Sequence, residues 1–98
     1  MLKNPKAKGA KRELKSRDLL KSRGYLHIVK AGGSLGMFDL AGLGQSGVIL
    51  VQVKSNRWPF GIEMDHMLEA ISILGRTHYT YEIHRWDDYA KEPKIRVL

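Results

Sequence analysis

The segment from Phe38 to Lys54 constrains the fold of this 98-residue chain more than any other. It holds two apolar runs, at 37–43 and 48–55, which the short turn Gly44-Gln45-Ser46-Gly47 separates. Two runs of β-forming residues joined by a glycine-flanked turn predict a β-hairpin. Several polar side chains are set into these runs, where burial is costly unless a partner satisfies them.

The spacing of these polar residues places them together. A turn centred between Gln45 and Ser46 puts Asp39 directly opposite Gln52. Side chains alternate between the faces of a strand, so Gln52 and Lys54 share one face, and opposed residues point to the same face. The hairpin therefore predicts a cluster of Asp39, Gln52 and Lys54 on one side of the sheet.

Such a cluster suits metal-assisted chemistry at phosphorus. The Asp39 carboxylate is a hard oxygen ligand for Mg²⁺ or Mn²⁺, and the Gln52 amide oxygen and the Val53 main-chain carbonyl add neutral oxygens. Lys54 can position a water molecule or offset charge on an attacked phosphate. The alternative is a buried ion pair between Asp39 and Lys54 beside a hydrogen-bonded Gln52.

The rest of the chain predicts a single α/β domain. The helix-forming residues 8–22 end before Gly24, and 25–31 and 77–86 have strand character. A short edge strand is expected near 95–98. Helix 62–74 carries apolar residues at a spacing that fits packing on a sheet, namely Met64, Met67, Leu68, Ile71 and Leu74. The predicted order is α-β-β-β-α-β, with residues 1–7 as a flexible basic arm and 8–98 as the domain.

The positive charge is strongly one-sided. The net charge is +7, and residues 1–30 hold ten Lys and Arg against Glu13 and Asp18. This distribution is typical of a polyanion-binding protein, although a solvated tail that aids solubility is the alternative. The predicted phosphate contacts are Lys6, Lys8, Lys11, Arg12, Lys15 and Arg57.

Composition also limits where the protein acts. The chain has no cysteine, which leaves neither disulfides nor thiolate metal sites. No apolar run approaches the roughly 20 residues that cross a bilayer, and the N-terminus begins with lysines in place of a secretory signal. We expect a cytoplasmic protein with no membrane partner.

Three further residues have two interpretations each. Glu13 is either a metal or water ligand or the partner of Arg17 in a surface ion pair. Ser34, in the glycine-rich loop 31–36, either contacts a phosphate or belongs to an ordinary connection. Trp58 either stacks on a base or covers an edge of the core.

Taken together, the chain resembles the PD-(D/E)XK nuclease superfamily, and most closely the archaeal-type and phage Holliday-junction resolvases. The residues that carry the likeness lie in 9–14, 20–25 and 31–34, in Phe38-Asp39-Leu40 and in Val51-Gln52-Val53-Lys54. The resemblance covers roughly residues 8–55. Beyond Lys54 only the order of elements matches.

The resemblance implies a restriction-endonuclease-like α/β core with a central mixed sheet. It implies a Mg²⁺-dependent (or Mn²⁺-dependent) endonuclease that cleaves four-way or branched DNA as a homodimer in recombination and repair. Glu13, Asp39, Gln52 and Lys54 would form the active site, and Ser34 would approach the scissile phosphate. A related VRR-type, restriction or repair nuclease and a catalytically silent nucleic-acid-binding module are the alternatives.

Two positions depart from the family pattern. Gln52 stands where the superfamily usually has a second acid, although Gln-x-Lys resembles the arrangement in some restriction endonucleases that act on modified DNA. Phe38 replaces the proline that precedes the Asp. Because Gln52 removes one negative charge, we expect weaker metal binding than at a site with two strand carboxylates.

Overall fold

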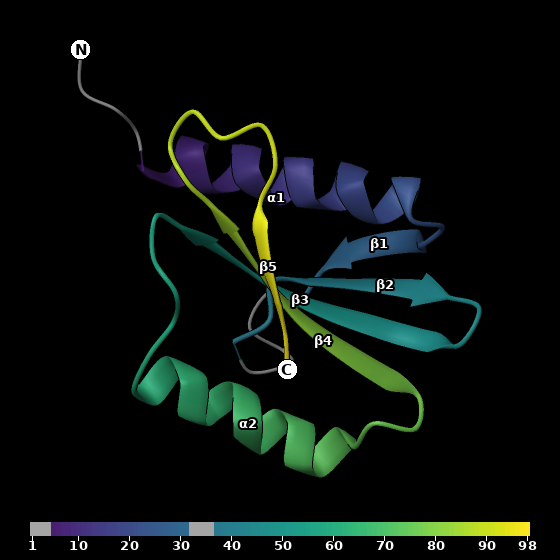
Figure 1. The fold of residues 1–98 in the computed structure, drawn as a ribbon. Coiled ribbons are helices and arrows are strands. Elements are labelled where there is room, and N and C mark those ends of the chain that lie inside the picture. Colours follow the sequence, from purple (N-terminus) through teal and green to yellow (C-terminus); the bar gives the residue numbers. More distant parts are fainter. Residues whose placement is uncertain (1–4, 32–36) are drawn as a thin grey trace.

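The protein is a mixed α/β domain, seen here in a computed structural model that describes residues 5–31 and 37–98. Its elements follow the order α1 (Pro5–Ser22), β1 (Leu26–Lys30), β2 (Leu40–Gly44), β3 (Gly47–Ser55), α2 (Ile62–Leu74), β4 (Tyr79–Trp86) and β5 (Lys94–Val97). Figure 1 shows the sheet between the two helices, with α1 on one face and α2 on the other. Within the described residues, no helix is long and apolar enough to span a membrane.

The described strands form one five-stranded sheet in the order β1-β2-β3-β4-β5. Neighbouring strands are antiparallel except for β3 and β4, which are parallel. Helix α2 makes the crossover between these two strands, as a parallel connection requires. The sheet is therefore mixed, as predicted, and β3 lies at its centre.

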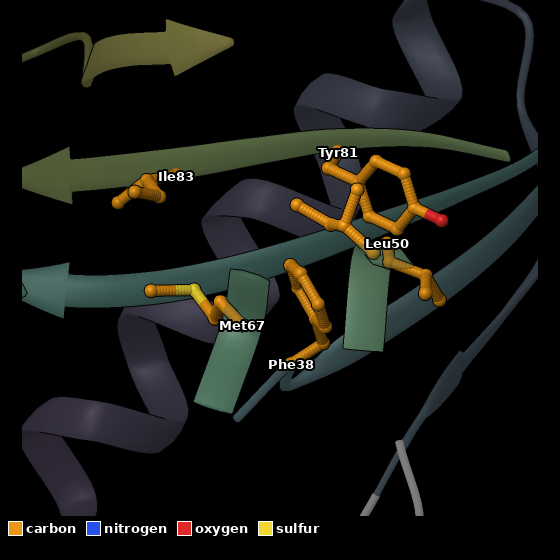
Figure 2. Packing of buried hydrophobic residues seen from close by; sticks show 6 residues of the cluster. Phe38, Leu50, Met67, Tyr81 and Ile83 are labelled. Carbon is orange, nitrogen blue, oxygen red and sulfur yellow. The ribbon is translucent and has the colours of Figure 1, made fainter. Parts of the chain in front are cut away.

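The alternating side chains of β3 serve two hydrophobic cores. On the α1 side, Ile49 and Val51 pack with Leu20 and Leu40. On the α2 side, the core joins one β3 residue to residues of β4, α2 and the segment before β2. Figure 2 shows five members of this cluster: Phe38, Leu50, Met67, Tyr81 and Ile83. The two faces of β3 thus fix both helices against the same strand.

The turn of the hairpin depends on glycine. Gly47 has a φ of 136°, and a Cβ added there would lie 2.1 Å from the carbonyl oxygen of His78. Only a residue without a side chain lets this turn pass so close to the chain that enters β4.

The predicted elements are confirmed, with shifted ends. Helix α2 has the predicted bounds, while α1 begins at Pro5 and so includes three residues assigned to the arm. Proline is favourable in the first turn of a helix, where its missing N–H is not needed. Residues 1–4 of the arm lie outside the described residues.

One predicted core position is wrong. Leu68 was expected to face the sheet, but its side chain is 48% exposed, whereas Met67 is fully buried. Ala70, which the pattern omitted, packs against the core instead. The face of α2 that packs on the sheet therefore includes the small Ala70 in place of the larger Leu68.

A buried polar network fastens α1 to the sheet. Ser16 accepts a hydrogen bond from Trp86 Nε1 (2.8 Å) and lies 3.0 Å from His84 Nδ1. His84 Nε2 is 2.9 Å from Glu82, whose two oxygens receive a pair of 2.7 Å hydrogen bonds from Arg23. Burial raises the pKa of Glu82, but the bonds from Arg23 and His84 outweigh it and hold that pKa at about 2. Charge and hydrogen bonding thus fix how α1 lies on β4.

Met67→Ala and Leu68→Ala together test the orientation of α2. Truncating the buried Met67 leaves a cavity and should lower the free energy of unfolding by about 2–5 kcal/mol. Truncating the half-exposed Leu68 should change it by only about 0.5 kcal/mol. Urea denaturation measures both, and equal losses would contradict the orientation described here.

Candidate active site

Asp39 lies just before β2, where the hairpin ladder ends. The paired residues run from Gly44–Gly47 to Leu40–Val51. This is the predicted hairpin register, and the observed pairing ends one residue short of the expected Asp39–Gln52 pair. There the Asp39 N–H donates to the Val51 carbonyl (2.8 Å), and the carboxylate accepts the Val53 N–H at Oδ2 (2.7 Å). The carboxylate thus takes the place of the next ladder bond and is held beside β3.

The surroundings of Asp39 disfavour its charge. Burial raises its pKa, the hydrogen bond from Val53 lowers it, Glu13 raises it and Lys54 lowers it, and the result is a pKa of about 6. A carboxylate that is desolvated next to another acid is stabilised by a cation. Glu13 and Lys54 are therefore both near enough to Asp39 for their charges to affect its pKa.

Gln52 provides the most unusual feature of the site. Its side chain is 5% exposed, and its Oε1 atom has no hydrogen-bond partner among the described residues. A buried amide oxygen without a partner is costly, and native proteins rarely leave one so. An oxygen of this kind, next to the residue that holds Asp39, is available to a cation.

Lys54 is paired with an acid that the sequence analysis missed. Its Nζ atom lies 2.5 Å from Oε2 of Glu63, in the first turn of α2. Arg57 approaches the other oxygen of Glu63 at 3.2 Å. The hydrogen bond from Lys54, with its charge and that of Arg57, keeps the pKa of Glu63 below its usual value. The Asp39–Lys54 ion pair, the alternative interpretation of this cluster, does not occur within residues 5–31 and 37–98.

A sequence signal for Glu63 did exist. Glu63 lies in the first turn of α2, the helix that follows the strand carrying Lys54. The helix dipole favours a carboxylate at this position. Because the loop between β3 and α2 turns back toward the sheet, only the fold shows that this acid reaches Lys54.

Glu13 projects from α1 toward the same end of β2. With Arg17, Lys30 and Leu40 it lines a small pocket of about 40 Å³ between α1 and the strands β1 and β2. The alternative i,i+4 pair with Arg17 is not formed in the described part of the chain, where Arg17 Nε is buried without a partner. Glu13 is thus a second carboxylate near Asp39, and it forms no ion pair within the described residues.

The predicted phosphate contacts have different surroundings. Lys11 and Lys15 are exposed on α1, as such a role requires. Arg12 is instead buried, and its Nη2 atom is 2.6 Å from Asp88, so it stabilises the fold and is poorly placed to grip a phosphate. Ser34 and the side chains of Lys6 and Lys8 lie outside the described residues.

Trp58 covers an edge of the core. Its ring packs against the α2-side cluster, and the guanidinium groups of Arg85 and Arg96 lie 5.6 Å and 4.3 Å from its centroid. Between these contacts it is only partly exposed, which favours the structural interpretation of Trp58.

The donors of this site suit a hard divalent cation in part. Glu13, Asp39 and the unpartnered Gln52 oxygen are oxygen donors of the kind that Mg²⁺ and Mn²⁺ prefer. In residues 5–31 and 37–98 no group of three or more His, Cys, Asp or Glu side chains is arranged to hold a metal ion. The third oxygen donor here is an amide, which a count of acidic and imidazole side chains leaves out.

Comparison with known protein families finds no family model that matches the chain, and a search of curated proteins finds no match either.

Replacing Asp39 by asparagine tests the electrostatics of the metal-free protein. Because the folded-state pKa of about 6 exceeds the ordinary value of 3.8, the folded protein binds this proton more tightly than the unfolded chain. The ionisation of Asp39 therefore lowers stability as pH rises between these values. In EDTA, Asp39→Asn should gain stability relative to wild type between about pH 4 and pH 7, measured by urea denaturation.

Asp65→Asn is the matched control, since Asp65 is an exposed carboxylate on α2. Its stability difference from wild type should stay nearly constant over the same pH range. A constant difference for Asp39→Asn as well would show that this carboxylate is not desolvated in the folded protein.

Proposed function

We propose that the protein is a metal-dependent, structure-selective DNA endonuclease, most similar in action to the Holliday-junction resolvases. It would hydrolyse phosphodiester bonds in four-way or branched DNA with Mg²⁺ or Mn²⁺ during recombination or repair, and an intracellular site of action follows from this substrate. The alternatives within the same fold are a VRR-type nuclease and a restriction or repair nuclease that acts on other DNA.

One observation carries the proposal. Val53 holds the Asp39 carboxylate, whose pKa is raised by burial and by Glu13, and next to Val53 in the strand the buried Gln52 oxygen has no partner among the described residues. A structural cluster would pair these oxygens with the nearby cation, but Lys54 is directed to Glu63 instead. Unpaired oxygens in a desolvated place are the requirement for binding a divalent cation.

The chain's own residues then have distinct roles. Asp39, Gln52, the Val53 carbonyl and Glu13 would hold the cation. A bound Mg²⁺ supplies a Lewis acid that polarises the phosphate. The Lys54 ammonium orients the attacking water and offsets charge at the phosphate. Glu63 fixes the position of the Lys54 side chain, while Ser34 would contact the phosphate from its loop.

Two features of the surface support the choice of DNA as partner and of a homodimer as assembly. Lys11 and Lys15 expose their charges one turn apart on α1. In the described sheet β1 is an edge strand, with Leu26 and Val29 63% and 57% exposed, which a second copy would cover. A two-fold dimer would match the near-two-fold symmetry of a four-way junction.

Cleavage of a labelled four-way junction tests the proposal. Asp39→Ala should lower the Mg²⁺-dependent rate by roughly 10²-fold or more, because it removes the principal carboxylate. Gln52→Glu should tighten Mg²⁺ binding by about tenfold, since it adds a negative charge to the cation site. Titration of the cleavage rate with Mg²⁺, and then with Mn²⁺, measures both effects.

Asp65→Ala is the control, since it removes an exposed carboxylate elsewhere on the domain. Equal wild-type rates on four-way junctions and linear duplex would exclude junction selectivity. Junction binding without cleavage in either metal would favour the silent binding module.

The salt dependence of junction binding tests the exposed face of α1. Each phosphate contact that a lysine makes releases counterions, so affinity should fall steeply as salt rises. Lys11→Ala and Lys15→Ala should each reduce the slope of log K against log salt by about 1. Lys91→Ala, in the loop before β5, is the control, and a slope unchanged in the α1 variants would exclude this face from the DNA contact.

A further inference from the structure

The loop between β3 and α2 presents apolar side chains to solvent next to the candidate site. Phe60 and Ile62 are each 71% exposed, although both are large and apolar. They occupy the loop and the first residue of α2, and neither belongs to the two hydrophobic cores. Two large apolar side chains exposed within three residues of each other, beside charged groups, are a candidate binding surface.

A chain of contacts joins Phe60 to the candidate catalytic lysine. The Arg57 guanidinium lies 5.3 Å from the centroid of the Phe60 ring. Arg57 also pairs with Glu63 at 3.2 Å, and Glu63 holds Lys54. The Phe60 ring is therefore linked to Lys54 through one cation–π contact and two ion pairs, at the end of the sheet where the site lies.

The surface around this loop is cationic. The parallel register places Lys54 beside Arg85, and the antiparallel register places Arg85 beside Lys94. Arg57 and Arg96 add two more cations, and the carboxylates in contact with this group are Glu63 and Asp87. We call the five cations with Phe60 the loop surface. Its five cations lie between positions 54 and 96, so residues distant in the sequence meet on this surface.

We propose that the loop surface is a second DNA contact in which Phe60 stacks on a base at the branch point of the substrate. This inference rests on the proposed function and adds a base-stacking residue to it. An aromatic ring with a guanidinium beside it offers stacking and charge to a nucleotide whose base is unstacked, as bases at a branch point are. Arg57 and Lys94, with side chains 51% and 64% exposed, then contact the flanking phosphates.

Charge complementarity selects DNA over a second copy of the chain. A two-fold interface on this face would place the loop surface of one copy against that of the other, so that their cations would repel one another. A polyanion neutralises the same cations. The homodimer, if centred on β1, uses the opposite edge of the sheet and leaves the loop surface free.

A fluorescence experiment without metal separates stacking from cleavage. The probe is a four-way junction with 2-aminopurine at the branch point, titrated with protein in EDTA. Wild type should change the fluorescence on binding. Phe60→Ala should weaken binding roughly 5- to 100-fold and reduce this change, whereas Phe60→Trp should retain both.

Ile73→Ala is the matched control, because Ile73 is 75% exposed at the other end of α2. It should bind like wild type. Sedimentation of each variant checks the oligomeric state.

Unchanged binding and fluorescence for Phe60→Ala would overturn the inference. So would dissociation of a wild-type dimer by Phe60→Ala, since the ring would then be a protein contact. A wild type that stacks on the junction but does not cleave it in Mg²⁺ or Mn²⁺ would contradict the nuclease proposal and leave the stacking surface supported.

Discussion

The pairing of β3 with its two neighbours is the constraint on which the rest of the structure depends. Antiparallel pairing with β2 places Asp39 beside Val53, and parallel pairing with β4 requires the α2 crossover that delivers Glu63 to Lys54. Because the side chains of β3 alternate, one strand supplies both hydrophobic cores and the candidate site. A shift of one residue in its register would exchange the cores and destroy the site.

Helix α1 is attached differently. Beyond the contacts of Leu20 it depends on the buried network of Ser16, His84, Glu82 and Arg23, in which nearly every polar atom has a partner. Such networks are costly when incomplete and specific when complete. This specificity matters for the proposed function, because the position of Glu13 near Asp39 depends on how α1 lies across the sheet.

Hydrogen bonding and charge divide the polar residues of the site into two groups. Lys54, Glu63 and Arg57 satisfy one another, while the carboxylate of Glu13 and the amide oxygen of Gln52 lack a protein partner in the described chain. Glu13 lies near Asp39, whose pKa is raised to about 6, and Gln52 precedes the residue that holds the Asp39 carboxylate. The unpaired oxygens are the physical basis of the proposed cation site. The affinity of that site for the cation should be low, because the amide of Gln52 stands where a carboxylate would bind more tightly.

The sequence by itself determined the order of elements, the hairpin frame and the bounds of α2, because these follow from local periodicity and turn chemistry. It also predicted the pairing frame that brings Asp39 next to β3, although the hydrogen bond from Val53 appears only in the structure. It could not show that Arg12 is buried against Asp88, that Leu68 faces solvent, or that Glu63 pairs with Lys54. Those facts depend on the rotation of each helix and on contacts between residues distant in the chain, which only the packed tertiary structure decides. The loop surface has the same origin, since strand pairing gathers charges from a segment whose net charge is close to zero.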